Sequence, residues 1–218
     1  MKSPRRKPIS VVIIEDHRMF REHLAHLIDK TDDMMVAGEA DNIVDGLSVV
    51  RQTRPSIAIV DVTLKGSSGL ELIKEMRAAR IDAPVLVLSM HDESLYAERA
   101  LRAGANGYIT KHQASADLLA AIHQILAGEI YLNRQFMARM MSKMMGRGAR
   151  DPIANLADRE LEVFRLLGSG LTTREIGEQL ALETTTVDTY VTRLKDKLDL
   201  NNIARLRLEA SLWVRQHE

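Results

Sequence analysis

Five short apolar runs, separated by segments with helical periodicity, fill the first 128 residues of this 218-residue chain. The strand-like runs lie at residues 9–14, 34–37, 57–60, 85–88 and 107–109. The segments between them repeat large apolar residues three and four apart, which is typical of amphipathic helices. Parallel strands need helical crossovers, and these crossovers are right-handed. The alternation therefore predicts an α/β fold, a doubly wound five-stranded parallel sheet packed between helices.

Polar residues follow the apolar runs at the points where the strands should end. Glu15 and Asp16 come after the first run, Asp61 after the third, Ser89 after the fourth and Lys111 after the fifth. In doubly wound sheets, ligands bind at the carboxyl ends of the strands. Asp61 alone would also suit a turn or a helix cap, but the joint placement favours a functional site.

The chemistry of this set indicates phosphoryl transfer. Three carboxylates in one crevice repel one another unless a cation lies among them, and oxygen ligands with room for water suit Mg²⁺. An ammonium group opposite them can neutralise a phosphoryl group, and a hydroxyl can hydrogen-bond its oxygens. We therefore expect phosphoryl chemistry on a carboxylate, with Asp61 as the acceptor.

The order of these residues resembles the receiver domain of two-component response regulators, over nearly all of residues 9–128. The matching residues are Glu15, Asp16, Asp61, Ser89, Tyr108 and Lys111. The resemblance implies that Asp61 accepts a phosphoryl group from a sensor histidine kinase or a small phosphodonor. The implied Mg²⁺ ligands are Glu15, Asp16, Asp61 and the backbone carbonyl of Thr63. Lys111 would bridge to the phosphoryl oxygens, while Ser89 and Tyr108 would move as a two-state switch.

Several positions depart from the family pattern. The acidic pair begins with Glu15 where two aspartates are common, and Lys65 stands where such domains often have proline. Met90 is bulkier than the small residue usual after the switch serine, and Thr63 replaces a commoner apolar residue. Glu15 changes the reach of the acidic pair more than its charge, and Lys65 would make the loop after Asp61 more mobile. Met90 and Thr63 bear on access to the phosphoryl group, so they leave the lifetime of the phosphorylated state open.

Residues 129–152 read as a connection between two domains. Residues 129–150 hold five Lys or Arg residues against one acidic residue. Methionines at 137, 140, 141, 144 and 145 predict a short helix with an apolar stripe, and the glycines at 146 and 148 predict a flexible linker after it. The predicted domains are residues 1–128, a helical and flexible linker at 129–152, and residues 153–218.

The last 66 residues predict four helices. Amphipathic patterns cover residues 158–167, 174–181, 185–198 and 203–214, and Thr172 or Thr173 can cap the second helix. The second and third helices, joined by about four residues, form a candidate helix-turn-helix, although any small helical bundle contains such hairpins. Surplus apolar surface on the fourth helix would suit pairing with a second copy.

Residues 156–210 also resemble the LuxR/FixJ-type helix-turn-helix. The matching residues are Leu156, Arg159, Glu160, Glu162, Val163, Leu166, Leu167, Gly170, Glu175, Ile176, Leu180, Thr186, Val187, Lys197 and Leu198. The resemblance implies that the third helix enters the major groove of double-stranded DNA. The candidate DNA-binding residues are Thr172, Thr173, Thr184, Thr185, Asp188, Thr189, Thr192, Arg193, Lys195 and Lys197.

The charge of this domain bears on its affinity for DNA. Residues 151–218 hold nine Lys or Arg residues against twelve Asp or Glu residues. Asp188 also stands where many relatives carry lysine, and Tyr190 where many carry histidine. We therefore expect weak binding by one copy and a homodimer on DNA.

Composition limits the other classes of protein. The chain has no cysteine, which excludes disulfides and thiolate metal sites. It has no run of about 18 apolar residues, so we expect a cytoplasmic protein without a membrane partner.

The sequence thus predicts a phosphorylation-dependent DNA-binding transcription regulator and not an enzyme. A phosphohydrolase built on Asp61 would need a second aspartate two positions later as general acid and base, and Thr63 occupies that position. The alternative is an adaptor whose receiver binds a partner and whose carboxy-terminal domain no longer binds DNA.

Overall fold

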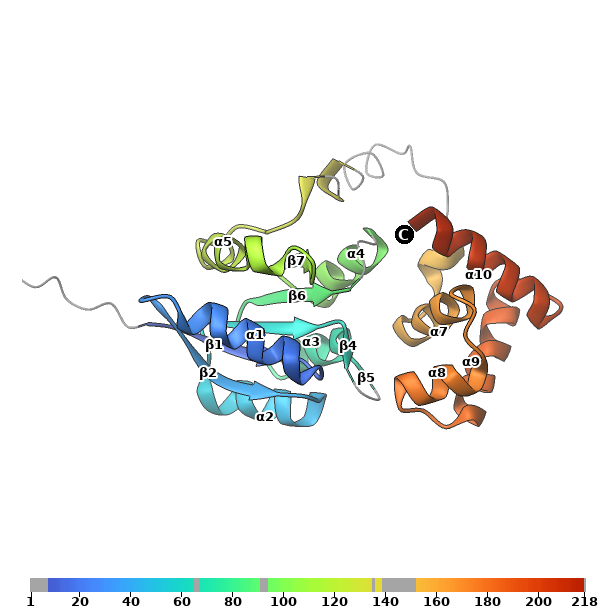
Figure 1. Ribbon diagram of the computed structural model, residues 1–218, viewed down its shortest axis with the longest axis horizontal. Coiled ribbons are helices and arrows are strands. Elements are labelled where there is room, and N and C mark those ends of the chain that lie inside the picture. Colours follow the sequence, from blue (N-terminus) through green and yellow to red (C-terminus); the bar gives the residue numbers. More distant parts are fainter. Residues whose placement is uncertain (1–7, 65–66, 91–93, 135, 139–151, 218) are drawn as a thin grey trace, which may run out of the picture. The chain divides into compact units, whose positions relative to one another are not determined.

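The computed structural model describes residues 8–64, 67–90, 94–134, 136–138 and 152–217. The chain groups into two compact units, residues 1–64 with 69–137 and residues 65–68 with 138–218. The first is an α/β unit, and the second is helical apart from a two-residue strand at Ser67–Ser68 (Figure 1). Within the described ranges, no helix is both long enough and apolar enough to cross a membrane.

A five-stranded parallel sheet forms the centre of the first unit. Its strands are β1 (Ile9–Ile14), β2 (Met34–Ala40), β3 (Ile57–Asp61), β6 (Val85–Ser89) and β7 (Gly107–Thr110). They lie in the order β2-β1-β3-β6-β7. This confirms the predicted doubly wound fold. Two short strands, β4 (Thr63–Leu64) and β5 (Ser67–Ser68), follow β3 along the chain.

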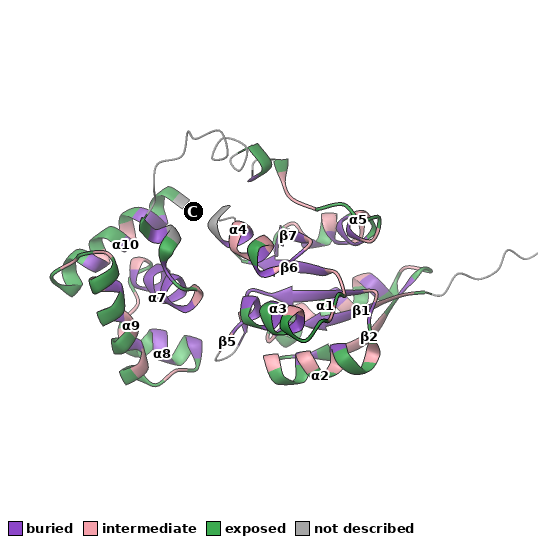
Figure 2. Cartoon of the chain, turned by 180° about the vertical axis from the view of Figure 1, so that it is seen from behind, coloured by how far each residue is buried: buried purple, intermediate pink, exposed green. Residues whose placement is uncertain are grey.

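Helices cover both faces of the sheet. They are α1 (Arg18–Asp29), α2 (Ile43–Thr53), α3 (Gly69–Ala78), α4 (Ser94–Ala103) and α5 (Ala114–Leu126). Alternate strand residues face opposite layers: Val11, Ile13 and Ile59 join one core cluster with residues of α1 and α5. The strand residues between them are buried as well, and Figure 2 shows β3 and β6 purple throughout. Burial on both faces explains why these strands read as continuous apolar runs.

The second strand is longer than its apolar run. Residues 34–37 were the expected strand, but β2 continues to Ala40 because Gly38, Glu39 and Ala40 pair with the backbone of β1. The pairing register shifts between Val11 and Val12. Backbone pairing needs no apolar side chain, so hydrophobicity alone underestimated this strand.

In the second unit, residues 152–217 form a short 3-10 helix at Pro152–Asn155 followed by four α-helices. Its helices are α7 (Asp158–Gly168), α8 (Thr173–Leu180), α9 (Thr184–Lys197) and α10 (Ile203–His217). The aromatic rings of Phe164 and Trp213 pack edge to face with centroids 5.9 Å apart, which joins α7 to α10. The turn between α8 and α9 has three residues, where we expected about four, and Ala181 in it has a left-handed φ of 52°.

The connecting segment is only partly described. Met137, in its described part, is 46% exposed. The other methionines of the predicted stripe lie outside the described residues, as do residues 146–151 of the predicted flexible linker.

Candidate functional site

The register of the sheet brings the polar strand ends of the first unit to one edge. Ile14 pairs with Val60, so Glu15 and Asp61 follow at the same level. Asp61 in turn pairs with Leu88 beside Ser89, and Ser89 pairs with Thr110 beside Lys111. The predicted convergence of these residues at the carboxyl edge is what the sheet register produces.

Lys111 links the two buried acidic residues of this pocket. Its ammonium Nζ lies 2.9 Å from Oδ2 of Asp61 and 2.7 Å from Oε2 of Glu15. The same Nζ lies 4.9 Å from the ring centroid of Phe20, within the range of a cation–π interaction. The Lys111 ammonium therefore forms ion pairs with the carboxylates of both Asp61 and Glu15.

The charge of Asp61 is only partly compensated. Burial is the largest influence and, with the charge of Glu15, it raises the pKa of Asp61 to about 7. The Lys111 ammonium and the Thr63 backbone N–H act in the opposite direction. Added positive charge in this pocket would favour the ionised form of Asp61, which is the nucleophilic form.

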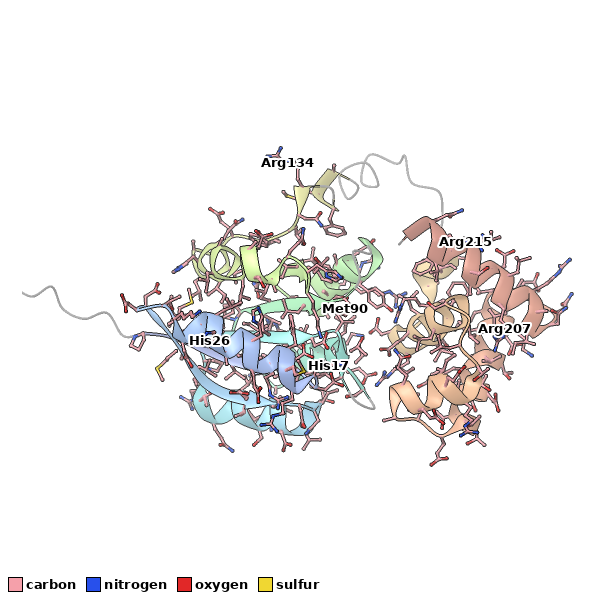
Figure 3. The ribbon with its side chains drawn as sticks, viewed as in Figure 1. His17, His26, Met90, Arg134, Arg207 and Arg215 are labelled. Carbon is pink, nitrogen blue, oxygen red and sulfur yellow. The ribbon has the colours of Figure 1, made fainter. Side chains whose placement is uncertain are left out.

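Metal-ligand atoms cluster at the end of β1. Within the described part of the chain, Glu15, Asp16 and His17 each offer one ligand atom, all within 4.8 Å of one another. His17 Nδ1 lies 3.1 Å from Oδ1 of Asp16 and 3.6 Å from Oε1 of Glu15, and the exposed residue lies before α1 (Figure 3). Two carboxylates and a partly exposed position fit a hydrated Mg²⁺.

His17 was not among the site residues predicted from the sequence. Its position directly after the acidic pair was the available signal. Asp61, which was expected among the metal ligands, is not in this group of three; its carboxylate oxygen is held by Lys111.

Backbone contacts fix the end of β3. The N–H of Gly69 donates to the carbonyl of Val62 over 2.7 Å. A Cβ atom at Gly69 would lie 1.9 Å from the Asp61 carbonyl oxygen and 2.9 Å from the Val60 side chain, so only glycine fits here. The first residue of α3 is thus packed directly on the backbone of the candidate phosphoacceptor.

The predicted switch residues lie on the neighbouring strands. Ser89 and Tyr108 are both buried, with 2% and 4% of their surface exposed. The Ser89 carbonyl accepts from the Lys111 backbone N–H at 2.7 Å. Met90, the next residue, is 54% exposed, and Lys65 lies outside the described residues.

In the second unit, α8 begins with the predicted threonine cap. The Thr172 backbone N–H donates to the Glu175 carboxylate at 2.7 Å, and the Glu175 N–H donates to the Thr172 hydroxyl at 3.3 Å. This reciprocal pair is a capping box. The side chain of Thr172 is exposed and that of Thr173 is half-buried.

The amphipathic character of α9 separates a packing face from an outer face. Val187, Val191 and Leu194 are buried. The candidate DNA contacts that are exposed are Thr184, Thr185, Asp188, Thr189, Thr192, Arg193 and Lys197, while Lys195 is half-buried. The hydroxyls of Thr189 and Thr192 donate to backbone carbonyls four residues earlier. Only Lys197, of this set, has an ion pair with another helix, through Glu160 of α7 at 2.7 Å within the described chain.

Comparison with known proteins assigns both units. Residues 11–123 match the family described as response regulator receiver domain, and residues 154–210 match bacterial regulatory proteins of the luxR family. BvgA of Bordetella pertussis, a putative positive transcription regulator of virulence factors, is 34% identical over 90% of this chain and 93% of that protein. The nitrate/nitrite response regulator NarL of Escherichia coli is 30% identical over 96% of each chain.

A solved structure agrees with these relatives. A LuxR-family two-component response regulator from Aurantimonas sp. SI85-9A1 is 30% identical, with a TM-score of 0.60, over 64% of this chain and 99% of that chain. The two domain matches occur in one polypeptide, and the two relatives are matched over 93% and 96% of their length. The chain therefore belongs to the LuxR-type response regulators of two-component systems, a family of transcription regulators.

Proposed function

We propose that this protein is switched by phosphorylation of Asp61 and binds double-stranded DNA through α9. The observation that carries the first part is the buried Asp61 carboxylate, held at 2.9 Å by Lys111 beside Glu15. A pKa of about 7 means that a modest gain of positive charge makes it a nucleophile.

The transfer step uses residues already in place. A carboxylate oxygen of Asp61 attacks the phosphorus of a phosphohistidine on a sensor histidine kinase, the new P–O bond forms, and the P–N bond breaks with its electrons returning to the imidazole. Lys111 can follow the negative charge from the carboxylate to the phosphoryl oxygens. Acetyl phosphate can serve as donor in the same way, with acetate leaving.

Mg²⁺ is the proposed cofactor, and it supplies charge neutralisation of the phosphoryl oxygens during transfer. Glu15 and Asp16 would hold it, together with Asp61 and the backbone carbonyl of Thr63. His17 lies close enough to order the Asp16 carboxylate through the 3.1 Å contact.

Phosphorylation would then change the strands beside Asp61. Ser89 follows the β6 residue that pairs with Asp61, and Tyr108 lies on the next strand, β7. A phosphoryl group offers acceptor oxygens to the Ser89 hydroxyl, so a shift of Ser89 leaves space in which Tyr108 changes its burial. Residues 129–152 would join this switch to the DNA-binding domain.

The DNA-binding step follows from α9. Its outer face carries Arg193 and several threonines, which suit contacts with phosphates and base edges. The acidic composition of residues 151–218 makes one contact weak, so two copies on paired half-sites would bind together.

The test treats the parent protein and Asp61→Asn with acetyl phosphate and Mg²⁺. The parent should gain one phosphoryl group by intact mass and should shift promoter fragments on a gel more strongly after phosphorylation. Asp61→Asn should do neither. Phosphorylation without any DNA binding would instead support the adaptor alternative, and labelling of Asp61→Asn would mean that another residue is the acceptor.

A further inference from the structure

The first half of α9 presents an acidic side chain among the candidate DNA contacts. Asp188 is exposed and lies beside the buried packing face that Val187 and Val191 form. Its carboxylate makes no hydrogen bond and no ion pair with the residues that the structure describes. The residues three and four positions away on either side are uncharged, so no cation within the helix neutralises it.

Such a residue opposes DNA binding unless it finds a hydrogen-bond donor. A carboxylate in the major groove is repelled by the phosphates on both sides. The edges of guanine and thymine offer acceptors there, while cytosine offers an N4 amino group. Adenine has an amino donor too, but its N7 acceptor lies next to it and would face the second carboxylate oxygen.

From this contrast we infer that Asp188 selects a cytosine in each half-site by accepting a hydrogen bond from its N4 amino group. The inference rests on the proposed DNA binding through α9. It identifies the chemistry of the sequence that α9 reads, which the resemblance to other regulators does not.

The threonines around Asp188 support the same reading. The Thr189 hydroxyl donates to the Thr185 carbonyl at 2.9 Å, and the Thr192 hydroxyl donates to the Asp188 carbonyl at 3.0 Å. Their protons are already used within the helix, so these side chains offer lone pairs and methyl groups to DNA. Such a surface suits the amino group of cytosine and the methyl group of thymine better than the acceptor edge of guanine.

The experiment selects DNA from a pool with randomised half-sites, using the full chain treated with acetyl phosphate and Mg²⁺. The variants are Asp188→Ala and Asp188→Asn, and Asp196→Asn is the matched control because it removes the same charge from an exposed position two turns later on α9. The parent should enrich cytosine at one position by about 5- to 20-fold over the other bases, which is the lower range for one base contact.

Asp188→Ala should lose this preference at that position alone, and Asp188→Asn should move it toward adenine, the base that asparagine pairs with. Asp196→Asn should keep the preference for cytosine. Equal base preferences in the parent and Asp188→Ala, with tighter binding to every sequence, would show that Asp188 only repels DNA and would overturn the inference. Failure of the parent to select any DNA would overturn the proposed function and the inference with it.

Discussion

Lys197, the last residue of α9, donates a hydrogen bond to Oε2 of Glu160 in the first turn of α7, over 2.7 Å. The same oxygen accepts the backbone N–H of Ala157 at 2.7 Å. Burial opposes the charge of Glu160, but these two donors and the nearby cations outweigh it and lower its pKa. One carboxylate thus caps α7 and ties it to the end of the proposed DNA-reading helix.

The ion pair with Glu160 gives Lys197 a different role from Arg193, the other cation considered on α9. We expect Lys197→Ala to lower the stability of the helical domain by about 1 kcal/mol, since the lysine is half-exposed and its ion pair is partly screened. Arg193→Ala should lower stability less than Lys197→Ala, because Arg193 acts on Glu160 only through its charge and donates it no hydrogen bond, and should reduce the salt dependence of DNA binding by about one unit of slope. The domain can be followed by Trp213 fluorescence, because Trp213 is the single tryptophan of the chain.

Lys197→Ala is also expected to weaken DNA binding. If both variants left affinity and salt slope unchanged, α9 would not be the DNA-reading element. A loss of salt slope in Lys197→Ala at full stability would instead mean that the ammonium leaves Glu160 for a phosphate.

The ion pair between Glu160 and Lys197 also predicts that the stability of the helical domain depends on pH in the acid range. Its pKa in the folded domain lies below the ordinary value of 4.5. Its stabilising effect is therefore fully present above about pH 4.5 and is lost as the pH falls through the lower, folded pKa. Thermal unfolding by Trp213 fluorescence should show a difference between the parent and Glu160→Gln at pH 6 that shrinks toward pH 3. A difference that stays constant over this range would contradict the pair.

For the receiver domain, the raised pKa of Asp61 predicts the opposite pH dependence of stability. Its folded pKa of about 7 lies above the ordinary 3.8, so without Mg²⁺ the folded state loses stability as the pH rises from about 4 through 7. Asp61→Asn should remove this loss and raise the receiver Tm at pH 8 by several degrees, roughly the effect of 1 to 2 kcal/mol. Calorimetry at pH 6 and pH 8 measures it. An unchanged pH dependence in Asp61→Asn would assign the effect to another group.

Mg²⁺ should reverse the destabilisation at pH 8 and should need Asp16. Few protein carboxylates hold Mg²⁺ without phosphate, so we expect weak binding, at about millimolar concentration. Asp16→Ala should lose the rise in Tm on adding Mg²⁺, whereas His17→Ala should keep most of it, because its imidazole is a poor Mg²⁺ ligand. Equal Mg²⁺ responses in Asp16→Ala and the parent would misplace the metal.

The sequence predicted the sheet well because its strands are buried on both faces and appear as uninterrupted apolar runs. The sequence also predicted that Asp61 and Lys111 lie close together, since the carboxyl ends of parallel strands share one edge of the sheet. It did not predict the link between Glu160 and Lys197. Both residues carried the family resemblance, but their contact depends on how α7 and α9 cross, which no local pattern specifies. The position of His17 beside Asp16 likewise depends on the turn that leads into α1.

The close packing of Gly69 on the Asp61 backbone holds the start of α3 in a fixed position on one side of the pocket. A residue with any side chain there would push α3 away from the acceptor, and the Gly69 hydrogen bond to Val62 holds the two backbones together. Structures of the phosphorylated and unphosphorylated protein should therefore superpose best on β3 and the first turn of α3. After this superposition, the displacement of backbone atoms between the two structures should increase from β6 to β7. The direction of that increase shows the side of the receiver through which the signal leaves.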